Sequence, residues 1–452
     1  MPTGFSWSEL SVDGARVQIV KDVPLQSGRA YVLYWCMVNH RAAQNHALDG
    51  MAELPGAFAA RGIPYWLELP RSPHEHLPRI AELAAHAAAV VSDLWPSFVV
   101  PGHLRGAARR LDVPLFAVDA SCVVPMQRIA ERQLGAYTLR PKLRKLWPQY
   151  LEQALPERAH RKARAAAKLV PPFAPADALA ARAALHTFAI DPAVAPVAGV
   201  RGGRSAALAA LDAFVSGRLA GYPEGRNDPG LDGQSSLSPY LHWGHLHAGE
   251  IVRAVHAALG PAHPAAEAYL EELLVRRELA FNYCLHTPPA QQLSLGSLPR
   301  WVQDTLERHR ADPREALYPL EVLDEARTDD GLWNAAQREL RERGRIHGYL
   351  RMLWGKRILG WSESPEEALR RIAHLNDRYA LDGRDPVSVA NFMWVLGLHD
   401  RPFQERPVLG KVRPMSSART AEKFDLGPYL ARWGRPSDPP VRVPRRRARP
   451  SP

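Results

Sequence analysis

The sequence predicts a two-part protein, with an N-terminal α/β domain built on a doubly wound, Rossmann-like parallel sheet and an all-helical C-terminal domain. Between residues 29 and 120, short apolar runs alternate with alanine-rich helical stretches, which is typical of strands buried between helices. From residue 203 to 433, nearly every segment has a helical period and ends at Gly or Pro, which indicates successive helices.

Five apolar runs are expected to form the strands, and they are AYVLYW (30–35), IPYWLEL (63–69), AAVVSDL (88–94), SFVVP (97–101) and VPLFAVDA (113–120). The shift from this alternation to a polar, basic stretch and then to helices sets the expected domain limits. They are 1–130 for the α/β domain, 131–202 for a connector, 203–433 for the helical domain and 434–452 for a tail. The tail is rich in Pro and Arg and is expected to be disordered.

The composition is that of a globular protein with a basic surface. Hydrophobic residues make up 46% and charged residues 23%, and 58 Lys and Arg against 47 Asp and Glu give a net charge of +11. Such a balance suits a polyanionic partner, although a solvated basic surface in an Arg-rich proteome would give the same total. No run of about 18 apolar residues predicts a membrane span.

The three cysteines, Cys36, Cys122 and Cys284, are far apart and form no CxxC pair. This spacing argues against a disulfide framework and against a structural metal site. The N-terminus also lacks the basic-then-apolar pattern of a signal peptide. We therefore expect a cytoplasmic protein without a bound metal.

A loop rich in small residues leads into a short helix between Tyr222 and the LHWGH segment. Ser238 is a suitable N-cap, and Pro239 suits the first helical position. Together, Ser235, Ser236 and Ser238 place hydroxyls and backbone amides beside a helix N-terminus, where phosphate groups bind. The alternative is a well-capped helix with no ligand.

The helix AEAYLEELLVRRELAFNYCLH carries Glu271, Val275, Glu278 and Asn282 at spacings of four, three and four, so one stripe is expected to hold them. A carboxylate and an amide beside an apolar face need partners if they are buried. The two neighbouring arginines are the alternative, because they could pair with the acids.

Three tryptophans lie on two successive predicted helices, Trp333 on the first and Trp354 and Trp361 on the second. Seven residues are two α-helical turns, so the last two indoles project from nearly the same face, roughly 10 Å apart along the axis. Tryptophans at this spacing are usually core anchors, and the spacing alone does not exclude that role.

Six blocks follow one another in a characteristic order, and they are YPEGRNDP, SSLSPYLHWGH, EELLVRRELAFNYC, LWNAAQRELRERGRIHGYLRMLWGKRIL, LNDRYALDGRDP and ERPVLGKVRPMS. In these blocks the chain resembles the class II cyclobutane pyrimidine dimer DNA photolyases of the photolyase/cryptochrome superfamily. The resemblance runs from about residue 34 to 433.

The resemblance implies a light-driven DNA-repair lyase. Its helical domain would bind FAD, active as the reduced anion, and its α/β domain would hold an antenna chromophore of the deazaflavin or folate type. A photoexcited electron would split a cyclobutane dimer flipped out of the duplex. UV-damaged DNA is the implied partner; the enzyme is expected to act as a monomer in the bacterial cytoplasm, at the nucleoid, without an obligate protein partner or a membrane.

The resemblance also implies site residues. The cofactor would be bound by Tyr222, Arg226, Asn227, Ser235, Ser236, Leu237, Ser238, Asn282, Arg351, Asn376 and Asp382. Among these, Arg351 and Asp382 would form an ion pair beside the isoalloxazine ring, and Asn376 would approach its N5 atom and tune its redox state. The lesion would be contacted by Glu278, as the hydrogen-bonding carboxylate, and by Met352, Trp394, Arg401 and Phe403.

Trp354, Trp361 and Trp333 match the family's electron-transfer tryptophans. The resemblance puts Trp354 nearest the flavin, and the helical spacing suggests Trp361 as the adjacent station and Trp333 as the third. Three alternatives stay open: a cryptochrome-type photoreceptor, a relative that repairs (6–4) photoproducts, whose associated histidines are not found here, and a basic DNA-binding scaffold whose tryptophans are core.

Overall fold

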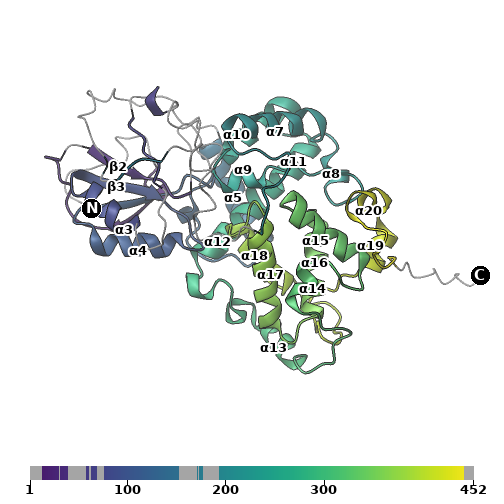
Figure 1. Cartoon of the computed structure of the whole chain (residues 1–452). Coiled ribbons are helices and arrows are strands. Elements are labelled where there is room, and N and C mark those ends of the chain that lie inside the picture. Colours follow the sequence, from purple (N-terminus) through teal and green to yellow (C-terminus); the bar gives the residue numbers. More distant parts are fainter. Residues whose placement is uncertain are drawn as a thin grey trace, which may run out of the picture.

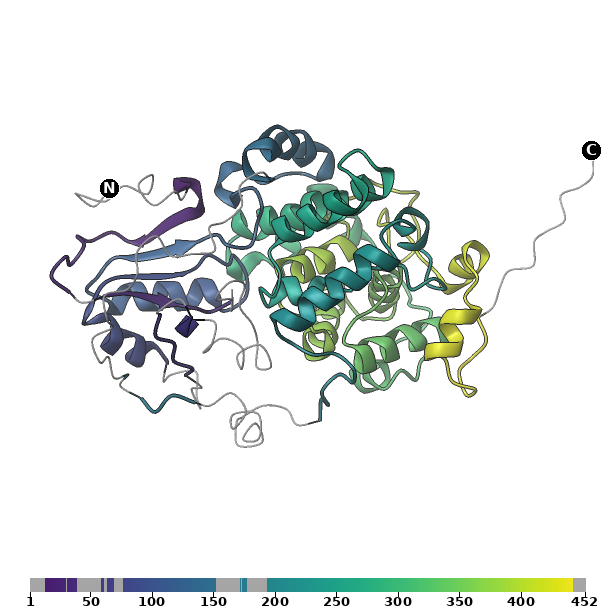
Figure 2. The same cartoon turned by 90° about the horizontal axis from the view of Figure 1, so that it is seen from above.

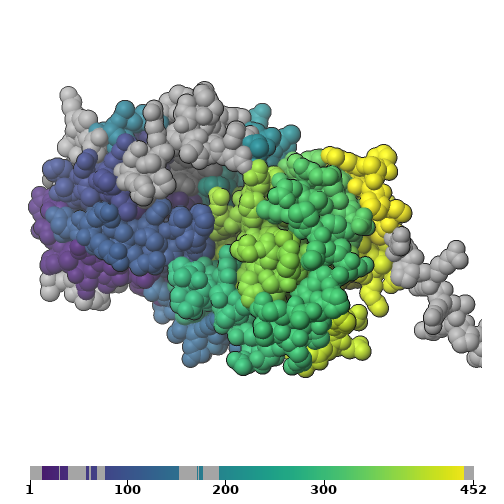
Figure 3. Space-filling view, turned by 60° about the horizontal axis from the view of Figure 1, so that its bottom comes forward, coloured from purple at the N-terminus to yellow at the C-terminus, as the bar shows by residue number. Residues whose placement is uncertain are grey.

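The structure, a computed structural model, describes residues 13–29, 31–38, 58–60, 63–68, 76–151, 171, 173–176 and 193–441. A sheet part at the N-terminal side and a larger helical part lie side by side (Figures 1 and 3). The predicted fold class, an α/β part followed by a helical part, is confirmed. Predicted features in residues 1–12 and in most of 39–75, 152–192 and 442–452, including the disorder of the tail, lie outside the described residues.

The sheet is mixed, so the prediction of a purely parallel sheet is wrong. Its strands are β1 (Val17–Lys21), β2 (Tyr31–Trp35), β3 (Ala87–Asp93) and β4 (Leu115–Val118), in the order β1-β4-β3-β2. The β2–β3 and β3–β4 pairs are parallel, whereas β1 pairs with β4 antiparallel. The short run VQIVK was not predicted as a strand, because it lies outside the alternating region and carries a lysine at its end.

Two of the five predicted strands are wrong. Residues 63–68 form no strand in the described part, and Pro64 there has no N–H to donate to a ladder. The run SFVVP is instead a turn into a helix. Phe98 has a left-handed backbone (φ 56°), and α4 starts at Val100 with a proline in its first turn, where the missing N–H costs nothing.

The two described helices of the sheet part, α3 (His76–Ala84) and α4 (Val100–Arg110), pack on the same sheet face. Their apolar residues form one core with Val90 of β3 and with Leu115 and Ala117 of β4. Phe281 of the helical part enters this core, where its ring meets that of Trp95 edge-on at 5.2 Å. The two parts therefore share buried apolar surface.

The helical part begins with α5. Its α-helices are α5 (Ala136–Leu151), α7 (Arg204–Gly217), α8 (Tyr222–Gly225), α9 (Ser238–His242), α10 (Ala248–Leu259), α11 (Pro264–Leu270), α12 (Arg277–Leu285), α13 (Arg300–Arg308), α14 (Leu320–Asp324), α15 (Gly331–Arg343), α16 (Gly348–Gly360), α17 (Pro365–Tyr379), α18 (Pro386–Val395), α19 (Ser417–Lys423) and α20 (Gly427–Trp433). A π-helix, η5 (Glu271–Arg276), joins α11 to α12. The short 3-10 turns are η2 (Gly14–Arg16), η3 (Met126–Arg128), η6 (Pro289–Gln291) and η7 (Leu295–Ser297).

Two apolar cores hold the helical part together. One is formed mainly by α15, α16, α17 and α18, and the other by α5, α7, α10, α11 and η5. The helix α5, which the sequence assigns to a connector, buries Leu139 and Leu143 in the second core. Among the described residues, no helix is both long and apolar enough to cross a bilayer.

Helices α16 and α18 approach closely at Gly355. A Cβ atom added there would lie 2.5 Å from Cγ2 and 3.1 Å from Cγ1 of Val395, whereas one added at Gly360 of the same helix would meet nothing within 4 Å. The glycine therefore sets how closely these two helices pack.

We expect Gly355→Ala to destabilise the protein by about 1–3 kcal/mol, because the added methyl forces the α16–α18 contact apart. Gly360→Ala is the matched control and should be neutral or stabilising by up to about 1 kcal/mol. Chemical denaturation of both variants checks this. Equal stabilities would contradict the close packing.

Candidate functional site

A cradle forms where the loop before α9 meets the corner between α15 and α16. Asp232 of this loop accepts hydrogen bonds from Arg343 (2.6 Å) and Arg345 (3.2 Å) of the corner. A Cβ atom at Gly348 would lie 2.8 Å from Nε2 of Gln234. The predicted serine loop and the predicted tryptophan helix are thus brought side by side.

The second wall of the cradle comes from the end of α17 and the start of α18. His242 of α9 contacts Asp385 (Nδ1 to Oδ2, 3.0 Å), and the Trp243 indole donates to the Leu381 carbonyl at 2.9 Å. The Ser388 hydroxyl donates to the Asp382 carbonyl at 3.1 Å and lies 3.5 Å from the amide nitrogen of Asn376. Asn376 and Asp382 are therefore neighbours, joined through Ser388.

Several buried polar atoms of these segments and of α18 have no hydrogen-bond partner among the residues that the structure describes. They are Oγ of Ser236, Oδ1 of Asp382, Nε1 of Trp394 and both ring nitrogens of His347. Ser236 also has a left-handed backbone, with φ at 63°. Buried polar groups are nearly always paired, so a polar ligand that reaches them would satisfy them. The donor and acceptor set fits the expected FAD.

The predicted ion pair between Arg351 and Asp382 is not formed. Within the described residues, no carboxylate lies close enough to Arg351 for an ion pair, and Oδ1 of Asp382 is buried without a partner. Arg351 is half-buried, and its positive charge has no counter-ion among the described residues. Desolvation of such a charge favours an anionic ligand.

Some of the remaining predicted cofactor residues are buried and others are exposed to solvent. Tyr222 is buried in an aromatic group with Phe214 and Tyr269, at 6.0 and 5.1 Å, and burial raises its pKa. Leu237 is fully buried, whereas Asn227 and Ser238 are exposed. Ser238 is the first residue of α9 rather than its N-cap, which is Leu237 and makes no side-chain capping bond.

Glu278 and Asn282 do not lie in the cradle but at the contact with the sheet part. The Glu278 carboxylate accepts from the backbone amides of Val123 (2.8 Å) and Val124 (3.4 Å). Asn282 accepts from the Gln133 amide at 2.8 Å and donates to the Glu131 carbonyl at 3.0 Å. Their position therefore differs from the expected one beside the other cofactor residues, and the roles expected of Glu278 at the lesion and of Asn282 at the flavin stay predictions.

The π-helix η5 is the physical reason for this difference. A π-helical turn holds one residue more than an α-turn, so it rotates everything after it relative to an ideal α-helix. The stripe predicted from α-spacing is therefore split. Glu271 faces α5, where Arg140 binds its two oxygens at 2.7 and 2.8 Å, while Glu278, beyond the π-helix, faces the sheet part.

A second carboxylate near the predicted cofactor residues is Glu272, which the sequence analysis did not single out. It accepts from Nη1 of Arg226 at 2.6 Å, and its side chain is 40% exposed. This pair stands beside Tyr222, whose pKa responds to both charges. The signal available in the sequence was a second glutamate, one residue after Glu271, in a block that also resembles the family.

An exposed rim continues from η5 to α18. The Arg276 guanidinium lies over the half-buried Trp394 ring at 5.7 Å. Met352, one residue after Arg351, is half-buried against the α15–α18 core. Arg401 and Phe403 lie on the following loop, where the Phe403 ring is flanked by the guanidinium groups of Arg401 (5.8 Å) and Arg413 (5.4 Å).

The three tryptophans form one chain of rings, but in a different order from the predicted one. Trp333 stacks on Trp354 at 6.3 Å with 3° between the ring planes, and it meets Trp361 edge-on at 5.5 Å. Trp333 is therefore the middle member. Its indole also donates to the Trp354 carbonyl at 3.0 Å, and all three side chains are buried.

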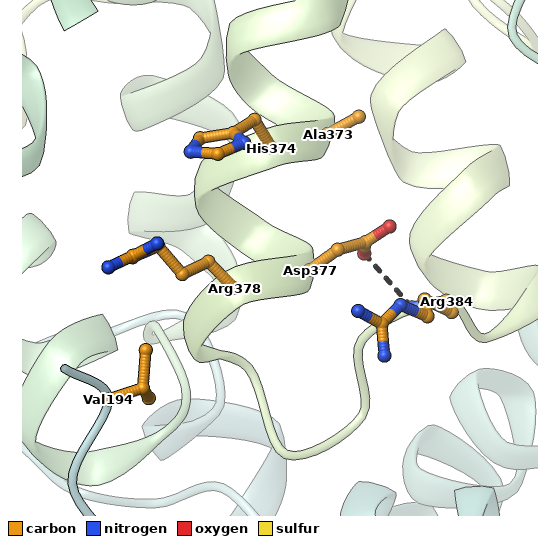
Figure 4. Close-up of a pocket in the computed structure, with 6 residues that line it drawn as sticks. All are labelled: Val194, Ala373, His374, Asp377, Arg378 and Arg384. Carbon is orange, nitrogen blue, oxygen red and sulfur yellow. Dashed lines mark hydrogen bonds between the residues drawn. The ribbon is translucent and has the colours of Figure 1, made fainter. Parts of the chain in front are cut away.

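A cavity of about 530 Å³ lies beside the C-terminal half of α17 (Figure 4). Ala373, His374, Asp377 and Arg378 of α17 line it together with Val194 and Arg384. Asp377 accepts from the backbone N–H of Arg384 at 2.9 Å and from the neighbouring Asn376 at 3.2 Å. None of the predicted cofactor residues is among the described residues that line this cavity, although Asn376 contacts Asp377 of its wall.

Similarity to solved structures defines the class of fold. The chain is similar to a cryptochrome of Synechocystis (TM-score 0.63, 18% identity, 90% of this chain and 84% of that one). It is also similar to a bacterial class III photolyase of Agrobacterium tumefaciens (TM-score 0.60, 18% identity, 89% and 80%). The fold is that of the photolyase/cryptochrome superfamily. No protein-family model matches the chain.

Curated relatives define the family more narrowly. The chain is 36% identical to the deoxyribodipyrimidine photo-lyase of Oryza sativa over 85% of this chain and 76% of that protein. It is 32% identical to the enzyme of the same name from Methanothermobacter thermautotrophicus, over 89% and 94%. The chain therefore belongs to the deoxyribodipyrimidine photo-lyase family.

The buried carboxyl of Glu278 predicts a pH dependence of stability. Burial raises its pKa from about 4.5 to about 8, against the lowering effect of the Val123 amide. Between these two values the native state retains a proton that the unfolded state releases, so this group destabilises the fold as the pH rises.

Compared with a Glu278→Gln variant, the wild type should therefore lose stability between about pH 5 and pH 8, by about 1 kcal/mol or more. Denaturant titrations of both proteins across this range measure the difference. Parallel stability curves would show that the carboxyl is not titrating in this window.

Proposed function

We propose that this protein is a light-driven DNA-repair lyase of the class II type, which binds FAD in the helical part and splits cyclobutane pyrimidine dimers in DNA. The observation that carries the proposal is the cradle, where segments of three separate blocks contact one another and each carries buried polar atoms without a partner among the described residues. The relatives named deoxyribodipyrimidine photo-lyase support the same activity over most of the chain.

Bound FAD, in its reduced anionic form, would supply one electron to the dimer on absorbing light and recover it once the two bonds between the bases have broken. The protein's part is binding and electrostatics. Ser235 and Ser236 suit the phosphates, because the Ser236 hydroxyl is buried without a partner. Asn376 and Asp382 suit the ring, and Arg351, which has no carboxylate counter-ion in the described part of the chain, suits its negative charge.

We assign the lesion-binding carboxylate to Glu272. It is half-exposed and held by Arg226, whereas the Glu278 carboxylate is occupied by backbone amides. Trp394, with Arg276 over its ring, offers an aromatic face on which an extruded base can stack. Met352 and the loop with Arg401 and Phe403 extend this apolar and cationic surface.

The three tryptophans serve photoreduction in this proposal. Indole is an easily oxidised side chain, and ring separations of 5.5 and 6.3 Å are short enough for an electron to move stepwise through the core. The order supported by the ring contacts is Trp361, Trp333, Trp354, with Trp354 as the member closest to the cofactor.

We further propose that the sheet part holds an antenna chromophore of the deazaflavin or folate type. The absorption spectrum of the purified protein would identify this chromophore. We also propose that the protein acts as a monomer at the nucleoid. Light scattering, which measures the molar mass in solution, tests the monomeric state. A photoreceptor function is the second candidate, because a cryptochrome is among the similar folds. Repair of dimers in DNA is the activity that distinguishes a photolyase from a photoreceptor.

We expect purified protein with chemically reduced flavin to restore dimer-containing duplex DNA under blue or near-UV light. Glu272→Gln should lower the repair yield several-fold with the flavin retained, because a charged acceptor for the bases is lost. Glu278→Gln is the matched control and should repair normally. The flavin absorbance and the amount of restored DNA are the two measurements.

Loss of repair in the Glu278 variant alone would overturn the assignment to Glu272. A wild-type protein that binds flavin but restores no dimer would favour the photoreceptor. Protein that takes up no flavin would exclude both.

Trp333→Phe should block photoreduction of oxidised flavin as severely as Trp354→Phe, because Trp333 is the ring that joins the other two. Repair by chemically reduced enzyme should be unchanged in both variants. Trp147→Phe, on α5 and outside the chain of rings, is the control. Flavin absorbance under illumination with a mild reductant follows the reaction. Normal photoreduction of the Trp333 variant would show that electrons do not pass through it.

A further inference from the structure

One helix face is exposed, basic and unassigned by the proposed function. Helix α5 buries Ala136, Leu139, Leu143 and Tyr150 on one side, and it lies on the outside of the helical part, as the blue helix at the upper edge of Figure 2. Its outward residues at helical spacing are Tyr137, Pro141, Lys142, Arg144, Lys145 and Pro148. We call these residues, with Leu134 just before the helix, the α5 face.

The charge of the α5 face is of one sign. The helix contains no Asp or Glu, and in the described part no carboxylate lies within ion-pair distance, 4.0 Å, of Lys142, Arg144 or Lys145. A helix whose surface carries several like charges pays a repulsion cost. An anionic partner would remove this cost.

The helix is firmly held, so its face is a fixed surface. Arg140 makes two hydrogen bonds with Glu271 of η5, and the neighbouring Arg276 lies 3.4 Å from the same carboxylate. Because Arg276 also covers the Trp394 ring, a continuous row of contacts joins α5 to the proposed lesion pocket.

The segment before the helix reaches the same rim. His399, just beyond α18, has its Nδ1 atom 2.9 Å from the Leu134 carbonyl. The Leu134 and Tyr137 side chains are 71% and 67% exposed. Large apolar side chains that stand free beside a proposed nucleic-acid site suit contact with sugars and unstacked bases.

We propose that the α5 face binds duplex DNA next to the flipped lesion, with Leu134 and Tyr137 against the nucleotides nearest the extruded dimer and Lys142, Arg144 and Lys145 on the phosphates beyond. The rise of an α-helix places Arg144 about 10 Å beyond Tyr137, so the charges extend away from the pocket along a strand. This inference rests on the proposed function, because it takes damaged DNA as the ligand.

The test is a binding titration in the dark, with a duplex oligonucleotide that carries one cyclobutane dimer and with the same duplex undamaged. In the variant Lys142→Ala/Arg144→Ala/Lys145→Ala, both duplexes should bind about tenfold more weakly at ~100 mM salt. The slope of log K against log salt should fall by about 2 to 3, because each lost phosphate contact removes about 0.9. Repair of bound DNA under light should be unchanged.

The matched control removes three exposed arginines from α4 in the sheet part, as Arg105→Ala/Arg109→Ala/Arg110→Ala. It changes the net charge equally and should leave the salt slope unchanged. Equal effects of the two triple variants, or no effect of the α5 variant, would overturn the proposal.

The apolar half of the α5 face is tested by Leu134→Ser/Tyr137→Ser. We expect weaker binding of the damaged duplex, a smaller loss for the undamaged one and an unchanged salt slope. Unchanged affinity for both duplexes would remove these two residues from the interface.

The proposed function fails separately, if the wild type neither prefers nor repairs the damaged duplex. A salt slope that still falls in the α5 variant would then keep the α5 face as a DNA-binding surface.

Discussion

The structure depends on one helix, α12, that is shared by the three largest apolar cores. Along α12, Leu279 contributes to the core of α5, α7 and α10, Phe281 to the core of the sheet part, and Tyr283 to the core of the tryptophan helices. Successive side chains of a helix point about 100° apart. One helix can therefore contribute to three different cores only if it is surrounded by protein on all sides. The polar residues Glu278 and Asn282 are buried for this reason, and backbone groups of residues 123–133 satisfy them.

The π-helix before α12 reconciles this enclosure with an accessible site. It changes the register, so the acids before it, Glu271 and Glu272, face α5 and Arg226, while Glu278 faces the sheet part. π-Helical turns are uncommon and often occur at functional sites. Here the extra residue lets one continuous segment, η5 and α12, contribute both to the rim of the proposed pocket and to the contact between the sheet part and the helical part.

The sequence predicted what depends on local pattern and failed where packing decides. The α/β and helical parts follow from periodicity, and three of the strands occur as predicted. The antiparallel β1 was missed because five residues with a terminal lysine carry little pattern. The predicted stripe of Glu271, Glu278 and Asn282 is split because α-spacing does not hold across a π-helix. Trp361 was placed next to Trp354 because spacing along one helix takes no account of a ring that enters from another.

That last difference shows how the electron path is built. Trp354 lies in α16 and Trp361 directly follows the last residue of that helix, roughly two turns further on. Trp333 of α15 lies between the two rings, stacked on one and edge-on to the other. Its indole N–H is held by the Trp354 carbonyl, so the ring that joins the two is fixed by the backbone of the helix that it bridges. The path therefore depends on how α15 packs against α16, and Gly344, with its left-handed backbone at φ 67°, is the turn that brings these two helices together.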